Sequence, residues 1–304
     1  MRLDLRPATP HIGADVEGLD LGKLADDQSA ETLDTLRRAL DRHIVLRFRG
    51  QSLSPQQMER LGGYFGPLLS LKRPENKTAD HIRGVEFLKI ISNARTADGR
   101  PLGDGSPNAQ DWHSDGAMKP RPATYTYFYA RKVPRIPPRT YWMNAYLIYT
   151  SLPDNVKARI AGLSVIHHHF TAGNEFPLPQ SLPLEVRQSG PRHPLVRVHP
   201  STGRPSLYLP HRSDALIIGM NSGESAELIS YLRDFARLAP FWWAAAMEVD
   251  DVVIWDNRPA LHRRDGWDPS EERVLWHLAN EGEAPIPYSA NSGASKATKV
   301  QMAS

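Results

Sequence analysis

The chain has 304 residues, of which 40% are hydrophobic and 23% charged, a composition typical of a globular protein with a sizeable core. Its formal net charge is only +3 and its Lys and Arg residues are scattered, which argues against a nucleic-acid-binding protein, because those usually carry a basic stripe. There is no cysteine, so disulfides, thiolate zinc sites and a cysteine nucleophile are excluded.

The N-terminal segment 1–18 lacks the apolar stretch of a secretory signal, and no apolar run approaches the length needed to cross a bilayer. We therefore expect a cytoplasmic enzyme or binding protein without a membrane partner. A small molecule is the expected partner, an anionic one being compatible with the charge, and the sequence leaves room for a homo-oligomer.

The predicted elements are short strands with a few helices among them. In chain order we expect a helix at 31–40, a strand at 43–48, a helix at 54–66, strands at 84–92 and 123–133, a helix at 152–162, a strand at 163–170, a hairpin at 193–209, a helix at 225–238, and strands at 250–258 and 273–280. The helix at 54–66 opens with Ser54, Pro55 and Gln57, a helix-start signature.

Many short strands and 26 prolines suit a loop-rich β core better than a helical bundle. The predicted fold class is therefore mainly β with flanking helices, built on a double-stranded β-helix (a jelly-roll, cupin-like core). We expect a single domain over residues 1–283, followed by a small and polar C-terminal tail at 284–304.

The segment DWHSDG places His113 and Asp115 two residues apart. In a strand, such residues point to the same face, so an imidazole and a carboxylate would share one point in space. This pair of donors suits iron(II), manganese or zinc. Taken alone, such a pair is more often an ordinary hydrogen-bonded pair on the surface.

The best candidate for a third ligand is His262, in the segment WDNRPALHRRDGW. It follows a strand whose Trp255 and aromatic neighbours would form the wall of a pocket. Two histidines and one carboxylate would leave open positions on a metal, which is the arrangement of oxygen-activating iron enzymes.

Arg273 is predicted to share a strand face with Leu275 and His277. A guanidinium group facing inward beside an apolar wall is costly unless an anion pairs with it. A dicarboxylate cosubstrate would supply that anion, held by the planar fork of the arginine. The alternative is a structural arginine paired with a nearby acid such as Asp256 or Asp265.

The segments WHSD and VVIWDNRPALHR, with an arginine eleven residues after His262, resemble the taurine dioxygenase / 2,4-D dioxygenase (TauD/TfdA) family of Fe(II)- and 2-oxoglutarate-dependent oxygenases. The resemblance implies a jelly-roll fold, with His113, Asp115 and His262 as the iron ligands. It also implies that Arg273 and Thr140 bind the distal carboxylate of 2-oxoglutarate.

The resemblance further implies a reaction. O2 and 2-oxoglutarate are converted to succinate and CO2 while an unactivated C–H bond of a small-molecule substrate is hydroxylated, or the substrate is desaturated or oxidatively cleaved. The protein positions the reactants and excludes water, and the cofactor carries the difficult step.

The sequence departs from the family pattern at two places. Many members have a Gly-Gly-Asp-Thr turn where this chain has IPPRT, which ends at Thr140. Taurine-specific members hold the sulfonate with an arginine at the position of His277 and use a histidine at the position of Leu71. We therefore do not expect taurine as the substrate. The candidates for substrate contacts are His277, Asn108 and Leu71, and His277 suggests a less anionic substrate or one recognised by hydrogen bonding.

Two other functions remain open at this stage. A zinc hydrolase could use His113, Asp115, His262 and a bound water, but it would leave Arg273 and Thr140 without a role. A non-catalytic protein on the same fold could bind a small molecule, although an intact set of ligands argues against it.

Overall fold

A computed structural model describes residues 3–70, 82, 84–167, 190–211 and 215–289. These residues belong to two compact units. The first unit consists of Met1–Asp115, Ala123–Asn144 and Phe241–Glu283, and the second of Gly116–Pro122, Ala145–Pro240 and Ala284–Ser304. The single domain predicted over 1–283 stays a prediction.

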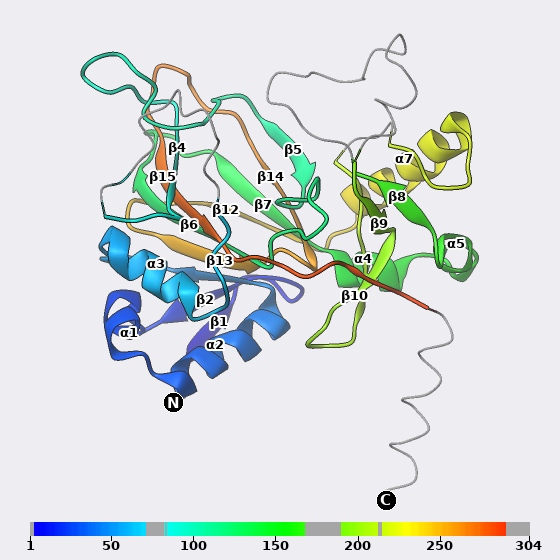
Figure 1. Cartoon of the computed structure of the whole chain (residues 1–304), viewed down its shortest axis with the longest axis horizontal. Coiled ribbons are helices and arrows are strands. Elements are labelled where there is room, and N and C mark those ends of the chain that lie inside the picture. Colours follow the sequence, from blue (N-terminus) through cyan, green and yellow to red (C-terminus); the bar gives the residue numbers. More distant parts are fainter. Residues whose placement is uncertain (1–2, 71–81, 83, 168–189, 212–214, 290–304) are drawn as a thin grey trace, which may run out of the picture. The chain divides into compact units, whose positions relative to one another are not determined.

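The first unit contains a large, mainly antiparallel sheet (Figure 1). In spatial order its strands are β1 (Asp4–Pro7), β2 (Ala14–Glu17), β3 (Val45–Phe48), β13 (Val252–Asp256), β6 (Tyr125–Lys132), β15 (Val274–Ala279) and β4 (Lys89–Ser92). One pair, β2 with β3, is parallel.

A second antiparallel sheet completes the β structure of the first unit. Its strands, in spatial order, are β12 (Trp242–Ala246), β7 (Arg139–Asn144), β14 (Ala260–Arg264) and β5 (Gln110–His113). All the residues that the sequence assigned to a metal or a 2-oxo acid lie in the first unit.

Three helices pack against one face of the large sheet: α1 (Leu21–Asp27), α2 (Ala30–His43) and α3 (Pro55–Gly63). Each begins at a side-chain cap, and α3 has the complete capping box between Ser54 and Gln57, which confirms the predicted helix start. Their buried leucines form one core with Tyr127 and Tyr129 of β6.

The opposite face of the large sheet is also buried. Phe128 lies between Tyr127 and Tyr129 in the sequence, and its ring is 4.9 Å from that of Trp255, centroid to centroid. Neighbouring side chains of a strand point to opposite faces. One face of β6 therefore packs in the helix-covered core, and the other packs in the interior of the β structure. The candidate site lies on this interior face.

The strand predicted at 84–92 is confined to β4, so its first half was wrong. The backbone amides of Phe87 and Leu88 donate to the carboxylate of Glu59 instead of to a neighbouring strand. A side chain thus takes the place of the sheet partner over this stretch.

The second unit contains two small sheets and three described helices. Strand β8 (Ser164–Ile166) pairs with β9 (Arg192–Pro194), and β10 (Val196–Val198) pairs with both β11 (Pro205–Leu207) and β16 (Ile286–Pro287). The helices are α4 (Ala145–Ser151), α5 (Asp154–Ile160) and α7 (Ser222–Leu238). The predicted hairpin is confirmed, with Gly203 in its turn at a φ of 68°.

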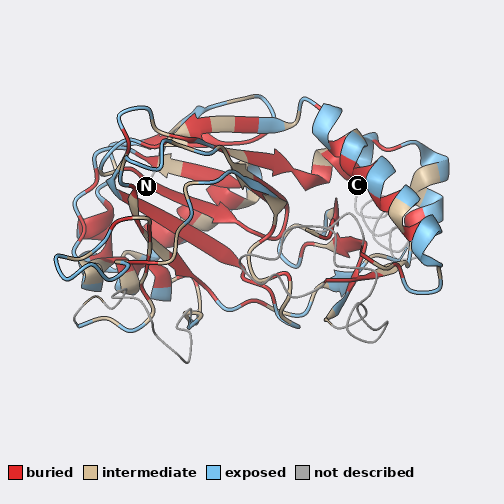
Figure 2. Ribbon diagram, turned by 90° about the horizontal axis from the view of Figure 1, so that it is seen from above, coloured by how far each residue is buried: buried red, intermediate tan, exposed pale blue. Residues whose placement is uncertain are grey.

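Strand β16 lies inside the segment predicted to be a polar tail. Tyr288 adds a further backbone bond to Val196, so folded structure continues past residue 283, while residues 290–304 lie outside the described part of the chain. Figure 2 shows that the strands are mostly buried and that exposed residues gather on helices and loops. Among the described residues, no helix has the length and hydrophobicity needed to span a bilayer.

Candidate active site

His113 and His262 face each other across two neighbouring strands. They are direct register partners on β5 and β14, and their ring centroids are 4.1 Å apart. The indole of Trp255 lies 5.0 Å from the His262 ring, as the sequence analysis expected of a pocket wall. The 149 residues that separate the two histidines in the chain are thus bridged by one cross-strand pair.

A β-bulge in β5 sets the position of His113. His262 pairs with His113, and Arg264 pairs with Gln110. The two pairs are two positions apart on β14 (264 − 262) but three positions apart on β5 (113 − 110), so β5 has one extra residue between them. Beside the bulge, Nδ1–H of His113 donates to the carbonyl of Asp111 at 2.7 Å. This bond selects the tautomer in which Nε2 of His113, 3.7 Å from Oδ1 of Asp115, carries the lone pair.

The sequence suggested that His113 and Asp115 lie on one strand. In the structure they do not, because β5 ends at His113. The side-chain amide of Asn257 takes the place of a neighbouring strand. Its Oδ1 accepts from the backbone N–H of Asp115 at 2.8 Å, and its Nδ2 donates to the carbonyls of Asp115 and Ala123, each at 2.9 Å. The Asp115 backbone is thereby fixed to the turn after β13.

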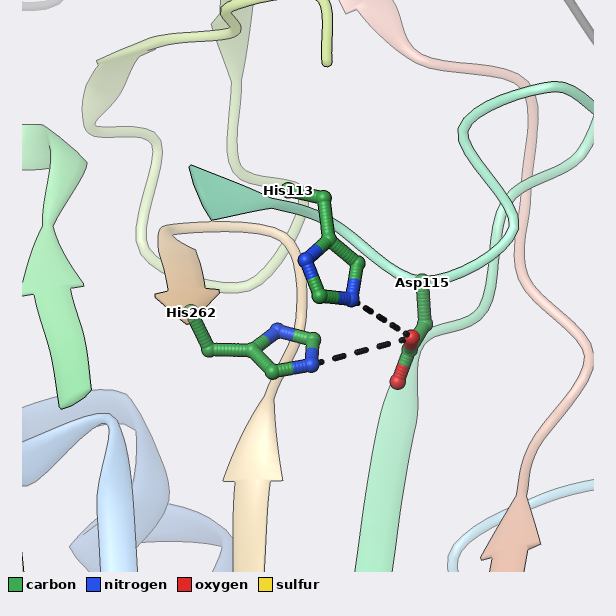
Figure 3. Close-up of side chains that lie close together, drawn as sticks. All are labelled: His113, Asp115 and His262. Atoms are coloured by element: carbon green, nitrogen blue, oxygen red, sulfur yellow. Dashed lines mark ion pairs between the residues drawn. The ribbon is translucent and has the colours of Figure 1, made fainter. Parts of the chain in front are cut away.

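These three residues bring their polar atoms together (Figure 3). Oδ1 of Asp115 lies 3.7 Å from Nε2 of His113 and 3.8 Å from Nε2 of His262, and one atom of each residue lies within 4.8 Å of the others. Burial raises the pKa of Asp115, but His262, His277 and His113 outweigh that effect and hold the pKa below its usual value. The group therefore offers two imidazole nitrogens and an ionised carboxylate.

Arg273 lies one residue before β15, where its backbone N–H donates to Oδ1 of Asn93 at 2.9 Å. It is only 4% exposed, yet its guanidinium has no hydrogen bond or ion pair with the residues that the structure describes. Burial, and after it the nearby Arg264, lower the pKa of Arg273 to about 9. This is the signature of a buried cation that lacks its anion.

The two acids that could have paired with Arg273 are bound elsewhere. Asp256 receives two hydrogen bonds from Arg258, at 2.8 and 2.6 Å, and Asp265 receives bonds from Arg263 and Tyr141. The purely structural alternative for Arg273 therefore loses both of its candidate partners.

Thr140 is the second residue of β7 and is 1% exposed. Its Oγ1 is buried and has no hydrogen-bond partner among the described residues. The stiff IPPRT turn therefore still delivers a buried threonine to the sheet, while Arg139 beside it is exposed.

His277 faces the same interior as the three clustered residues. Its Nε2 lies 3.9 Å from Oδ2 of Asp115, and its ring packs edge-on against Phe128. Burial lowers the pKa of His277 to about 4, despite the opposing effect of Asp115, so the imidazole is neutral near pH 7. Asn108 is exposed and offers its carbonyl to Arg264, whereas Leu71 lies outside the described residues.

Some residues that build the site were missed by the sequence analysis. Asn257 was noted only as part of a motif, although the Trp-Asp-Asn turn after a strand was a usable signal for a polar clamp. Arg264 and Trp267 were not considered, yet both lie beside Arg273. Their contact is made in the segment between β14 and β15, where the Trp267 Nε1–H donates to the carbonyl of Glu271, and no periodic pattern reveals it.

A mainly-β scaffold that carries clustered histidines, a carboxylate and a buried unpaired arginine belongs to the class of non-haem metal oxygenases. The family model described as "Taurine catabolism dioxygenase TauD, TfdA family" matches residues 4–279, and the chain belongs to this family. The protein is an α-ketoglutarate-dependent non-haem dioxygenase.

Curated relatives agree with this assignment. The chain is similar to (S)-phenoxypropionate/α-ketoglutarate-dioxygenase of Delftia acidovorans, with 31% identity over 288 residues that cover 90% of this chain and 94% of the relative. It is also similar to pentalenolactone F synthase of Streptomyces arenae, with 26% identity covering 95% of this chain and 98% of that one.

The solved structure of AAD-2 in complex with Mn(II) and N-oxalylglycine is similar as well. It has a TM-score of 0.74 at 25% identity and covers 94% of this chain and 100% of that chain. Together with the family match, this confirms the predicted double-stranded β-helix.

Proposed function

We propose that His113, Asp115 and His262 bind Fe(II), and that Arg273 and Thr140 bind the distal carboxylate of 2-oxoglutarate. The enzyme then couples the conversion of 2-oxoglutarate and O2 to succinate and CO2 with oxidation of a C–H bond in a small molecule. One observation carries the proposal above the others: the buried guanidinium of Arg273, which lacks an anion, lies near Arg264, two residues after His262 of the clustered His–Asp–His set.

The donor set fits iron. Two neutral imidazole nitrogens and one carboxylate are the ligands of mononuclear iron(II) oxygenases, and bound there the metal would supply the O2 chemistry. Asp111 holds His113 in the tautomer that presents Nε2, and Asn257 holds the Asp115 backbone. Oδ2 of Asp115 is buried and lies 3.9 Å from Nε2 of His277.

Arg273 and Thr140 fit a carboxylate. Arg273 offers a planar fork of donors and Thr140 a hydroxyl, and neither group is satisfied within the described residues. A 2-oxo acid with a second carboxylate would satisfy both groups while its keto-acid end is held at the His–Asp–His set.

For the primary substrate, we propose recognition through hydrogen bonding and apolar contact at His277 instead of a strong ion pair. His277 stands where taurine-specific relatives are expected to carry an arginine, and it is bounded by Phe128. The relatives compared above are named for a phenoxypropionate and for pentalenolactone F, so the family accommodates unlike carbon skeletons.

The test is anaerobic addition of Fe(II) and 2-oxoglutarate to the metal-free protein, followed by a succinate-release screen. The screen covers aryloxy- and alkyl-carboxylates, sulfonates, amino acids and biosynthetic intermediates. We expect a weak visible charge-transfer band in the first step and substrate-dependent succinate in the second. A colourless mixture would favour the zinc hydrolase, and a coloured mixture that never releases succinate would favour a binding protein.

A further inference from the structure

Arg264 is the last residue of β14 and lies two residues after His262, so both side chains point to the interior face. Its register partner on β7 is Thr140, the hydroxyl proposed for the distal carboxylate. Arg263, between them, lies on the other face, with its guanidinium 3.5 Å from the ring centroid of Tyr141. One strand thus carries neighbouring arginines in two different environments.

The guanidinium of Arg264 is held in place by backbone carbonyls. It donates to Asp265 at 2.7 Å, to Ser106 at 2.9 Å and to Asn108 at 2.8 Å. It also lies over the indole of Trp267, 4.4 Å from the ring centroid. Carbonyls fix its direction without neutralising its charge.

Arg273 shares the same indole. Its guanidinium carbon is 5.4 Å from the Trp267 centroid, and the Trp267 Nε1–H donates to the carbonyl of Glu271 at 3.0 Å, which keeps the ring in position. Two guanidinium groups are therefore drawn to one aromatic side chain, close enough for Arg264 to disfavour the charge on Arg273.

The acid nearest in sequence does not neutralise the pair. The carboxylate of Asp265 accepts hydrogen bonds from Arg263 at 2.8 Å and Tyr141 at 2.9 Å, whereas Arg264 donates to the carbonyl of Asp265. The charge of Asp265 favours the cationic form of Arg264, but by less than burial disfavours it. Neither Arg264 nor Arg273 has an ion pair with any described residue. Two like charges so arranged are unfavourable until an anion binds between or beside them.

We propose that Arg264 supplies a second positive charge to the cosubstrate pocket and thereby selects a 2-oxo acid with a distal carboxylate over one without. This inference rests on the proposed function, because it assigns a positioning residue to the same pocket. Arg273 binds the carboxylate directly, and Arg264 acts on it through the field and through the shared Trp267 ring.

The experiment compares two ligands that differ only in the distal carboxylate, 2-oxoglutarate and 2-oxopentanoate. Their dissociation constants are measured by calorimetry without O2 on the Mn(II)-loaded protein, and the ratio of the two constants is the readout. We expect Arg264→Gln to lower the preference for 2-oxoglutarate about tenfold, the effect of removing one partly screened charge. The affinity for 2-oxopentanoate and for Mn(II) stays within about twofold of the wild type, because neither depends on that carboxylate.

Arg263→Gln is the matched control, since it removes the same charge from the opposite face of the same strand. It leaves the preference unchanged. Arg264→Lys keeps the charge but not the three carbonyl bonds, and it retains the preference within about threefold, since the charge is preserved.

An unchanged preference in Arg264→Gln, or an equal loss in Arg263→Gln, would overturn the inference. If Arg264→Gln does not fold, Arg264→Lys decides, because loss of the preference in that variant would overturn it as well. A wild-type protein that shows no preference for 2-oxoglutarate would instead overturn the proposed function itself.

Discussion

Two buried arginines of the first unit show opposite chemistry. Arg258 is 8% exposed and binds Asp256 through two hydrogen bonds, with a third from its guanidinium to the Tyr125 hydroxyl at 3.2 Å. Burial alone would lower the pKa of Arg258, but Asp256 more than offsets it and the pKa is raised. Arg273 is 4% exposed, has no acid, and has a lowered pKa.

The two arginines distinguish a structural region, where the buried charge of Arg258 is paired, from a binding region, where the buried charge of Arg273 is not. Removing one partner of a buried ion pair destabilises the fold because the other charge is left uncompensated, whereas a buried charge without a partner is a candidate for binding a ligand. Substitutions in the first region should therefore lower stability, and substitutions in the second should lower function.

The largest effect is expected for Asp115→Ala, which removes a proposed metal ligand from the unsatisfied region. Iron-dependent succinate release should fall by more than about 100-fold, since even residues that only support metal ligands reach 10–100-fold. Thermal unfolding should stay cooperative. Asp111→Ala is the control, because that residue contributes its carbonyl to His113 and its side chain is exposed. Turnover that survives in Asp115→Ala would reject the ligand assignment.

Arg258→Met tests the satisfied region. It leaves the carboxylate of Asp256, 1% exposed, without its guanidinium, and the free energy of unfolding should fall by about 3–5 kcal/mol. Urea unfolding measures the change. The affinity of the folded variant for 2-oxoglutarate should match the wild type, and a selective loss of that affinity would mean that Arg258 belongs to the site.

Arg273→Met makes the same substitution in the other region and should have the reverse outcome. The affinity for 2-oxoglutarate should fall about 100-fold, as expected for two charge-assisted hydrogen bonds, while stability is unchanged or increased. Calorimetry with Mn(II) reports metal binding separately. Equal losses of metal and cosubstrate affinity would make Arg273 a structural residue.

The smallest effect is expected for Thr140→Val, which replaces an unsatisfied buried hydroxyl by a methyl group of similar shape. One hydrogen bond from a hydroxyl to a carboxylate contributes about 1.5 kcal/mol at the lower end of its range, so the affinity for 2-oxoglutarate should fall about tenfold without loss of stability. Thr124→Val is the contrasting variant, because its hydroxyl donates to the carbonyl of Glu281 at 3.1 Å and its loss should lower stability. A Thr140→Val protein with unchanged affinity would remove Thr140 from the site.

The sequence predicted those features of the fold and site that depend on local order. Ser54 predicted the start of α3 because a capping side chain acts on a residue only three positions away. The apolar period of 225–238 predicted α7. His113, Asp115 and His262 were selected by residue type and spacing, and their side chains do converge in space. Their role as ligands remains a proposal.

What the sequence did not reveal depends on contacts between distant segments. Asn257 acts on Asp115 across 142 positions of the chain, and Arg264 donates to the carbonyls of Ser106 and Asn108 across 158 and 156 positions. The same is true of Glu59, whose carboxylate accepts from the backbone amides of Phe87 and Leu88, in the first half of the strand predicted at 84–92. Such side-chain contacts depend on the same interactions as helices and strands do, but they produce no periodic pattern in the sequence.

The bulge in β5 determines which of two neighbouring rings faces the interior. In a regular ladder that started from the pair of Gln110 with Arg264, Trp112 would lie opposite His262, and His113 would point to the other face. The extra residue shifts the pairing by one position, so the imidazole takes the place that the indole would otherwise occupy. A change that straightened this strand without shortening it would therefore exchange the two rings and remove the imidazole from the interior.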